Sequence, residues 1–181
     1  MPNYRRWFIP GGTYFFTTVT AGRRPILTSE LARPMLRGAL AAELGATPFD
    51  LNAIVLLPDH IHTLWTLPDG DSAYPLRWKR IKERFTRRYL AAGGGETGRR
   101  SRGPRRGRNV WQPRYWEHVV RDEDDFKRCL DYIHWNPVRH GLVARVLDYP
   151  WSSFHKWVEL GEYDLDWGEG EPGDVPGAEW D

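Results

Sequence analysis

The sharpest chemical feature of the sequence is a pair of histidines, His60 and His62, separated by Ile61. On a β-strand, residues two apart project to the same face, so the two imidazoles would lie side by side while Ile61 points into the core. Two imidazoles on one face provide half of a site for a divalent metal ion. A lone His-x-His also occurs by chance on surfaces, but this pair lies in an otherwise apolar stretch, residues 53–67, which favours a metal site.

A second feature is the pair Tyr132 and Asn136, which are four residues apart on a predicted helix over residues 122–136. The apolar stripe of this helix consists of Phe126, Leu130 and Ile133. At about 100° per residue, the face that carries Tyr132 lies roughly 100° around from that stripe. We therefore expect Tyr132 at the border between core and solvent, where an isolated tyrosine ordinarily has a structural role.

Together these residues could cleave a phosphodiester. A metal ion held by His60 and His62 can polarise the phosphate as a Lewis acid, and an amide oxygen from Asn136 would complete three protein ligands. The hydroxyl of Tyr132 can form a covalent intermediate, which conserves the bond energy for strand transfer as attack by water does not. Because a free phenol has a pKa near 10, the metal or a water bound to it would have to activate the tyrosine.

The distribution of charge predicts a polyanionic partner. The chain has 181 residues and a formal net charge of +2, but nine acidic and no basic residues lie between Glu159 and Asp181. The body, residues 1–158, therefore has 26 basic and 15 acidic residues, accompanied by most of the ten tryptophans. Cationic grooves with stacking rings bind single-stranded nucleic acid. Core aromatics and solvated arginines would give the same composition, so composition alone leaves both interpretations open.

Other classes of protein are excluded by simple features. The longest aliphatic run, residues 53–57, is far shorter than the roughly 18 residues of a membrane span. The single cysteine, Cys129, excludes an internal disulfide framework. No apolar segment follows the basic N-terminal residues, so no signal peptide is predicted. We expect a cytoplasmic protein with no membrane partner.

The predicted elements follow the order β-α-β-β-α-β, with further helices behind. The expected strands are residues 13–20, 49–57, 60–67 and 116–120, and the expected helices are residues 29–44, 74–90, 122–136 and 151–160. This order is typical of an α+β, ferredoxin-like split sheet, here with an added C-terminal helix that carries Tyr132 and stops before Pro137. One domain, residues 1–160, would contain them, with a basic flexible loop insertion at 91–110 and an acidic irregular tail at 161–181.

Several longer stretches recur in order and are specific as a set. They are Tyr4 to Arg6, Gly11 to Thr17, Leu57 to His62, Trp111 to His118, Asp131 to Val138 and Pro150 to Phe154. Through them, over most of residues 4–160, the chain resembles the REP-associated tyrosine transposases. These are a branch of the single-tyrosine HUH transposases, which act on single-stranded DNA.

The resemblance implies a role for each residue of the site. His60 and His62 match the metal ligands, Tyr132 matches the nucleophile, and Asn136 stands where related enzymes place a third ligand. Enzymes of this kind use Mg²⁺ or Mn²⁺ to cleave single-stranded DNA beside hairpins of repetitive extragenic palindromes. They leave a 5′-phosphotyrosine and a free 3′-OH, and they rejoin strands. By raw affinity, two imidazoles would also suit Zn²⁺ or Ni²⁺.

The resemblance also bears on assembly and location. Other single-tyrosine transposases often pair the histidines of one subunit with the tyrosine of another, whereas this branch assembles the site within one chain. We expect a monomer, with a dimer left open, associated with the nucleoid.

Eight residues are candidate DNA contacts. Residues 77–108 contain 13 basic and 2 acidic residues, so the helical part of this segment could line a DNA groove. The arginine-rich loop could hold the backbone of a hairpin, although an idle, solvated insertion explains it equally well. The candidates are Arg77, Lys79 and Lys82 on the helix, Trp116 as a stacking residue, and Arg5, Arg6, Thr13 and Arg114 in the resembling stretches.

Two other hypotheses remain. A retired transposase that binds hairpins without catalysis is one, although the presence of both histidines, Tyr132 and Asn136 argues against it. The other is a metal hydrolase that uses the two histidines and a water nucleophile. In that case the substitution Tyr132→Phe would leave cleavage intact.

Overall fold

The computed structural model describes residues 6–96 and 109–168, so Arg5, most of the arginine-rich loop and the end of the acidic tail lie outside it. The strands are β1 (Thr13–Val19), β2 (Asp50–Leu56), β3 (His60–Thr66) and β4 (Trp116–Val119). The helices are α1 (Ala32–Ala46), α2 (Tyr74–Ala91), α3 (Glu123–Arg139) and α4 (Phe154–Glu159), with single 3-10 turns at η1 (Ala21–Arg23) and η2 (Val146–Asp148).

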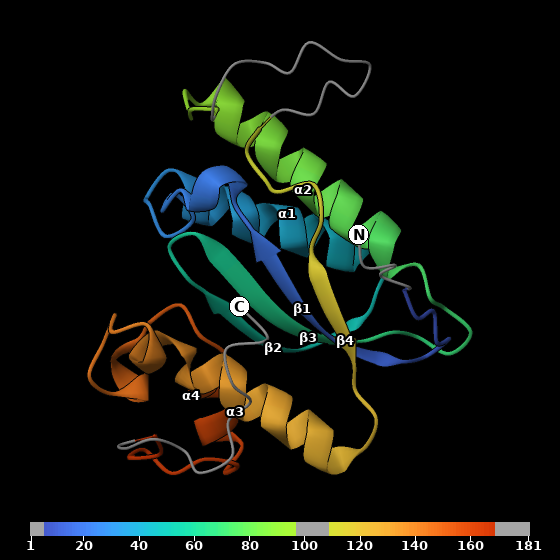
Figure 1. Cartoon of the computed structure of the whole chain (residues 1–181), viewed down its shortest axis with the longest axis vertical. Helices are drawn as coiled ribbons and strands as arrows, with labels where there is room; N and C mark the ends of the chain where they lie inside the picture. The colour runs from blue at the N-terminus through green and yellow to red at the C-terminus, as the bar shows by residue number, and fades with distance from the viewer. Residues whose placement is uncertain (1–5, 97–108, 169–181) are drawn as a thin grey trace.

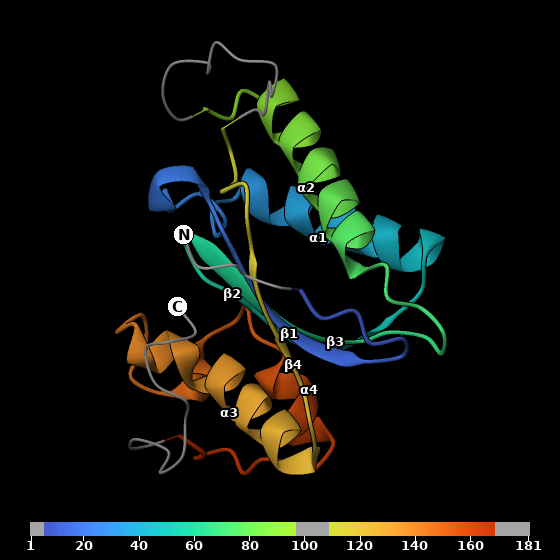
Figure 2. The same ribbon diagram turned by 45° about the vertical axis from the view of Figure 1, so that its right-hand side comes forward.

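The four strands form one sheet in the order β2-β3-β1-β4, and every neighbouring pair is antiparallel. The predicted ferredoxin-like order is thereby confirmed, and β2 and β3 form a hairpin. Helices α1 and α2 cover one face of the sheet, and α3 and α4 cover the other (Figures 1 and 2). The layer formed by α3 and α4 is the one that positions the candidate site.

The alternation of side chains along β1 fills two cores. Tyr14 and Phe16 pack in the core beneath α1 and α2, whereas Phe15 packs in the core beneath α3. This division follows from the two-residue period of a strand, and the β-branched and aromatic residues of β1 suit a sheet buried on both faces. The central strand therefore has no solvent-facing side.

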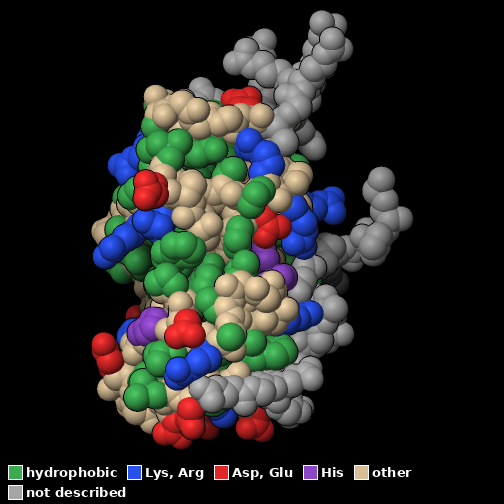
Figure 3. All heavy atoms as spheres, turned by 90° about the vertical axis from the view of Figure 1, so that its left-hand side faces the viewer, with side chains coloured by type: hydrophobic (Ala, Val, Ile, Leu, Met, Phe, Trp, Pro, Cys, Tyr) green, Lys and Arg blue, Asp and Glu red, His purple; other side chains and the backbone are tan. Residues whose placement is uncertain are grey.

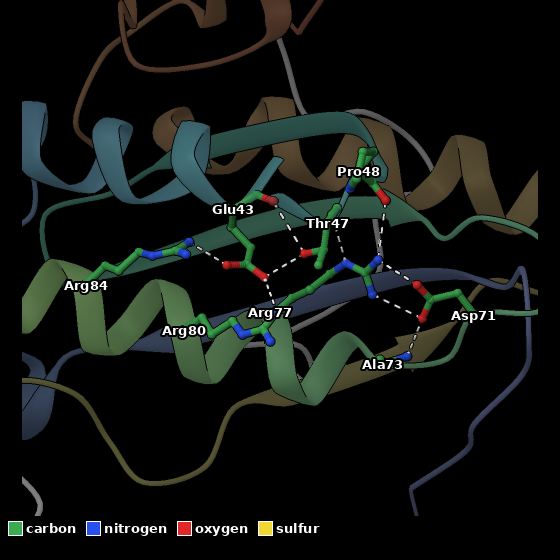
Figure 4. Close-up of polar contacts among 8 residues, drawn as sticks. All are labelled: Glu43, Thr47, Pro48, Asp71, Ala73, Arg77, Arg80 and Arg84. Atoms are coloured by element: carbon green, nitrogen blue, oxygen red, sulfur yellow. Dashed lines mark hydrogen bonds and ion pairs between the residues drawn. The ribbon is translucent and has the colours of Figure 1, made fainter. Parts of the chain in front are cut away.

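Buried charges hold α1 against α2 (Figure 4). The carboxylate of Glu43, fully buried on α1, pairs with Arg80 and Arg84 of α2 and accepts a hydrogen bond from the hydroxyl of Thr47. A buried carboxylate needs such partners, because desolvation without them costs several kcal/mol.

Arg77 belongs to the same helix interface and corrects a prediction. Its guanidinium is 4% exposed and donates to the carboxylate of Asp71 and to the backbone carbonyls of Thr47 and Pro48. These donors are used within the fold (Figure 4), so Arg77 does not line a DNA groove as the charge pattern had suggested. Its basic charge stabilises the turn that precedes α2.

Helix α3 begins as predicted but ends later. Asp122 caps it, accepting a hydrogen bond from the backbone N–H of Asp125 at 2.8 Å. The prediction that the helix stops before Pro137 was wrong, because the helix continues to Arg139. A proline near the last turn removes only its own hydrogen bond, and the N–H of His140 still donates to the carbonyl of Asn136 at 3.0 Å.

Smaller differences concern the ends of other elements. Helix α1 begins at Ala32 rather than at Ser29, although the Ser29 hydroxyl still accepts a hydrogen bond from the Ala32 N–H, and it continues past Gly45. Residues 161–168 form no helix or strand, as expected for the tail, but Tyr163 is buried and donates its hydroxyl to Asp131. The packed body thus extends beyond the predicted boundary at residue 160.

Within the described ranges, none of the helices is both long enough and apolar enough to cross a membrane.

Candidate active site

Strand β3 presents both histidines to the α3 face of the sheet. Ile61, between them, is fully buried in the opposite core, as predicted. The side chains of His60 and His62 are also buried, and their ring centroids lie 4.8 Å apart with the planes nearly perpendicular. The strand periodicity therefore places the two imidazoles together, as the sequence indicated.

A neighbouring oxygen holds each imidazole at its Nδ1 atom. Nδ1 of His60 lies 2.6 Å from a carboxylate oxygen of Asp59, and Nδ1 of His62 lies 2.9 Å from the hydroxyl of Thr17. A carboxylate at Nδ1 favours the tautomer with the proton on that atom, which leaves a lone pair on Nε2. Nε2 of His60 is buried and has no hydrogen-bond partner among the described residues. It is oriented as a metal ligand would be.

The surroundings favour a neutral imidazole at His62 and an ionised carboxylate at Asp59. Burial, followed by the nearby His60, His140 and Arg139, holds the pKa of His62 well below its ordinary value. Burial alone would raise the pKa of Asp59, but the hydrogen bond from His60 and the charge of Arg23, which lies 3.2 Å away, outweigh it and lower that pKa. A neutral imidazole is the form that binds a metal.

Tyr132 lies directly against this pair. Its ring centroid is 5.3 Å from that of His62 and 5.7 Å from that of Phe15, and the guanidinium carbon of Arg139 lies 5.4 Å from the ring. Tyr132 is fully buried, so the predicted border position was wrong. The arc of α3 beside its apolar stripe faces a layer of aromatic and imidazole rings from β1 and β3 rather than solvent.

Asn136 completes the group. His62 touches Tyr132, and the ring of His60 lies 5.1 Å from that of His140. Asn136 is four residues after Tyr132 and four before His140, which directly follows α3, so it shares their side of the helix and lies opposite the two histidines. Both of its side-chain amide atoms are buried and have no hydrogen-bond partner within the described part of the chain.

The donor set fits a divalent metal ion. Buried polar atoms are nearly always hydrogen-bonded, and an ion is one of the few explanations for atoms that are not. Two imidazole nitrogens and one amide oxygen suit several first-row divalent ions, and the amide oxygen also suits Mg²⁺ and Mn²⁺. The fit to a metal ion rests on Nε2 of His60 and on the side-chain amide of Asn136. Among the described residues these atoms are buried without hydrogen-bond partners, on elements that face each other.

The structure adds two residues that sequence reasoning missed. Arg139 and His140 lie seven and eight residues after Tyr132, which places them on the same helix face. Their spacing was readable in the sequence, but because the helix was predicted to end before Pro137, neither residue was assigned to the group of His60, His62 and Tyr132. His140 is exposed at the end of α3, beside His60.

A second group of potential ligands lies at the other end of α3. Atoms of His118, Asp125 and Cys129 lie within 4.8 Å of one another. Asp125, however, accepts hydrogen bonds from Arg121 and His118 and pairs with Arg128, and burial together with the charge of Asp125 raises the pKa of the Cys129 thiol. We interpret the group as a structural cluster that anchors the start of α3, since Arg121 and Arg128 already neutralise the Asp125 carboxylate.

The candidate DNA contacts fall into separate places. Arg6, Lys79 and Lys82 line one cavity of about 780 Å³ between α2 and the segment 109–115. Arg114 is exposed beside it, and Trp116 packs edge-on against Phe15 on the α3 face.

Thr13 lies elsewhere. It pairs with Thr66 at the far end of β1, whereas the histidines pair with Thr17 and Val19 at the other end. The structure therefore separates Thr13 from the candidate site.

The opposite edge of the sheet has a different character. A cavity of about 700 Å³ between α1 and β2 is lined mainly by leucine and isoleucine side chains and by Trp151. Figure 3, which faces the left side of Figure 1, shows hydrophobic side chains gathered at mid-height on that side. The basic cavity is at the β4 edge, so the β4 edge is the one suited to a polyanion.

Comparison with known proteins gives close relatives over nearly the whole chain. The chain is 43% identical over 168 residues to the REP-associated tyrosine transposase of Escherichia coli K12, covering 92% of this chain and 91% of the relative. It is 41% identical over 168 residues to a second protein assigned to that family, from Haemophilus influenzae, covering 93% and 94% of the two chains. No family model matches the chain.

Among solved structures, one of a REP-associated tyrosine transposase bound to a REP hairpin is similar throughout. It superposes with a TM-score of 0.80 at 40% identity, covering 99% of this chain and 96% of the other. This similarity shows that the two chains share one fold.

Proposed function

The chain belongs to the REP-associated tyrosine transposases, and we propose that it cleaves and rejoins single-stranded DNA beside hairpin repeats through a covalent 5′-phosphotyrosine. The observation that carries the proposal is the contact between the rings of Tyr132 and His62, at 5.3 Å, next to His60. A nucleophile and two ligand-type imidazoles from distant parts of the sequence thus meet in one buried group.

In this proposal, His60, His62 and Asn136 hold Mg²⁺ or Mn²⁺. The metal, when bound, neutralises charge on the scissile phosphate and favours ionisation of a nearby hydroxyl. The tyrosine oxygen attacks phosphorus, a bond from that oxygen to phosphorus forms, and the bond from phosphorus to the 3′ oxygen breaks. The phenol gives up its proton, and the leaving oxygen gains one to become a free 3′-OH. Rejoining is the same exchange in reverse.

The surrounding residues orient these groups. Asp59 and Thr17 fix the two imidazole rings through their Nδ1 atoms. Arg139 lies over the ring of Tyr132, where its charge would favour an ionised phenol and an incoming phosphate. Burial of the whole group favours the tyrosine over water as the nucleophile, which is the observation that supports strand transfer over simple hydrolysis.

The partner in this proposal is hairpin DNA with an unpaired flank. One solved relative is bound to a REP hairpin, and this chain has a basic cavity beside the sheet that carries His60 and His62. A chromosomal DNA substrate would associate the protein with the nucleoid. Because the histidines and the tyrosine meet within one chain, a monomer suffices for the site.

The experiment that tests the proposal uses labelled single-stranded DNA that carries a palindromic repeat from the genome encoding the chain. The protein is incubated with it in Mn²⁺, Mg²⁺ or EDTA, and products are resolved on denaturing protein gels. We expect a covalent DNA–protein adduct in either metal and none in EDTA. Hairpin binding on several repeats without any adduct would instead support the retired, non-catalytic binder.

A further prediction concerns Asp59. The substitution Asp59→Ala removes the carboxylate at Nδ1 of His60, and loss of such a partner ordinarily weakens metal affinity about 10- to 100-fold. Mn²⁺ affinity, measured by electron paramagnetic resonance in the absence of DNA, should fall by that amount. The matched control is Asp69→Ala, an exposed aspartate beyond the other end of β3, which should change nothing. Equal affinities in the two variants would contradict the proposed orienting role.

A further inference from the structure

We propose that His140 is a further protein ligand of the metal ion, a third imidazole beside His60 and His62, and that it helps to determine which ions the site prefers. This inference rests on the proposed function, because it concerns the same ion that His60, His62 and Asn136 would hold. It adds a ligand that lies outside both the His-x-His pair and the pair of Tyr132 and Asn136.

The end of α3 brings His140 to the histidines of β3. Tyr132, Asn136 and His140 follow one another at intervals of four residues, so they form one stripe along the helix. The ring of Tyr132 lies against that of His62, and the ring of His140 lies against that of His60. The stripe therefore runs alongside the histidine pair, with Asn136 between the two ring contacts.

The backbone at the end of α3 fixes the position of His140. Its N–H donates to the carbonyl of Asn136 at 3.0 Å, and the N–H of Leu142 donates to the carbonyl of Pro137 at 2.9 Å. Between them, Gly141 has a φ of +65°, the left-handed conformation that commonly ends a helix. His140 therefore belongs to a hydrogen-bonded helix end rather than to an unrestrained loop.

The spacing of the rings matches imidazoles that share one ion. The ring centres of His60 and His62 lie 4.8 Å apart with the planes at 83°, and those of His60 and His140 lie 5.1 Å apart with the planes at 69°. A nitrogen bound at about 2.1 Å places its ring centre roughly 3.2 Å from the ion, so two rings about 100° apart around that ion have centres roughly 5 Å apart. The distance from His60 to His140 is as suitable as the distance from His60 to His62.

His140 differs from the other ligands in its exposure. His60, His62 and Asn136 are buried, whereas His140 is exposed at the end of α3. The three imidazoles still form one electrostatic group, because burial, then His60 and then His140 hold the pKa of His62 well below its ordinary value. His140 can therefore complete the site from its solvent side.

A third imidazole changes which ions the site prefers. Imidazole nitrogens suit Zn²⁺ better than Mn²⁺, whereas an amide oxygen and water suit Mn²⁺ and Mg²⁺. Four protein ligands also leave a tetrahedral ion such as Zn²⁺ without an open position, whereas a six-coordinate ion such as Mn²⁺ keeps two. We therefore expect His140 to strengthen the binding of Zn²⁺ more than that of Mn²⁺.

The test compares metal binding by the wild type and by His140→Ala, with the full-length protein and no DNA. Mn²⁺ affinity is measured by electron paramagnetic resonance, and pulsed spectra of the same samples detect the nitrogen nuclei of coordinated imidazoles. Since even the loss of a group that orients a ligand weakens metal affinity about 10- to 100-fold, the affinity of His140→Ala should fall at least about tenfold. The nitrogen modulation should fall from that of three imidazoles to that of two. An unchanged modulation would overturn the proposal, whatever the affinity.

A competition experiment measures the preference between ions. With Mn²⁺ saturating both proteins, Zn²⁺ should displace it from the wild type at a several-fold lower concentration than from His140→Ala. The matched control is His155→Ala, which removes a half-buried imidazole of α4 whose Nε2 lies 3.2 Å from the carbonyl oxygen of Tyr149. This control should behave as the wild type does, and equal effects of the two substitutions would overturn the role of His140. Thermal melts in EDTA establish that both variants fold.

The outcome is separable from that of the proposed function. A metal-dependent tyrosine adduct, together with identical metal binding by the wild type and His140→Ala, would leave the function standing and refute the additional ligand. Coordination of three imidazoles without any adduct on hairpin DNA would refute the catalytic function while the role of His140 is retained.

Discussion

Replacement of Tyr132 by phenylalanine is expected to abolish the covalent DNA–protein adduct and to reduce strand cleavage by roughly four orders of magnitude or more. Loss of a nucleophile has effects on this scale in enzymes that work through covalent intermediates. The ring would keep its contacts with His62 and Phe15, so the buried layer stays packed. Only the attacking oxygen is lost.

The informative comparison is between cleavage and binding. Hairpin affinity in EDTA should be nearly the same for the wild type and Tyr132→Phe, which shows that the variant is folded and engages DNA. Cleavage by Tyr132→Phe at the wild-type rate would contradict the covalent mechanism and support a metal hydrolase that uses water.

Replacement of Arg77 by methionine is expected to destabilise the fold by about 2–4 kcal/mol. The change removes the buried guanidinium, leaves the carbonyls of Thr47 and Pro48 without this donor, and leaves the Asp71 carboxylate with only the N–H of Ala73. This destabilisation lies toward the lower end of the range for breaking a buried ion pair, because the Asp71 side chain is 27% exposed and partly hydrated. For a chain of this length the melting temperature should fall by roughly 5–15 °C.

The matched control is Lys79→Met, which removes a positive charge two residues away on the exposed side of α2. Its stability should change by no more than about 0.5 kcal/mol. Hairpin binding, measured well below both melting temperatures, should show the reverse order, with Lys79→Met weakened and Arg77→Met near the wild type. A variant Arg77→Met as stable as Lys79→Met would contradict the structural role.

The sequence predicted the features that depend on local periodicity. The alternation along β1 and β3 was sufficient to place His60 and His62 on one face and Ile61 on the other, and the element order predicted the sheet. The four-residue spacing of Tyr132 and Asn136 placed both on one helix face. Each of these inferences needs only the geometry of a single strand or helix.

The features that depend on partners far along the chain were not predictable. Arg77 looks like a surface charge until Asp71 and the carbonyls of residues 47–48 are brought around it by the packing of α1 on α2. Tyr132 looks like a border residue because the side chains that bury it include His62, whose polarity gives no sign of an interior position. Propensity alone also cannot tell that α3 tolerates Pro137, since packing against the sheet outweighs one lost hydrogen bond.

The contact of His62 with Tyr132 inside one chain has a genetic consequence. In the proposed mechanism, each molecule uses its own histidines and its own tyrosine, so two molecules inactivated at different residues do not complement each other. A gene inactivated at His62 and a second gene inactivated at Tyr132 would therefore not restore cleavage when both are expressed in one cell.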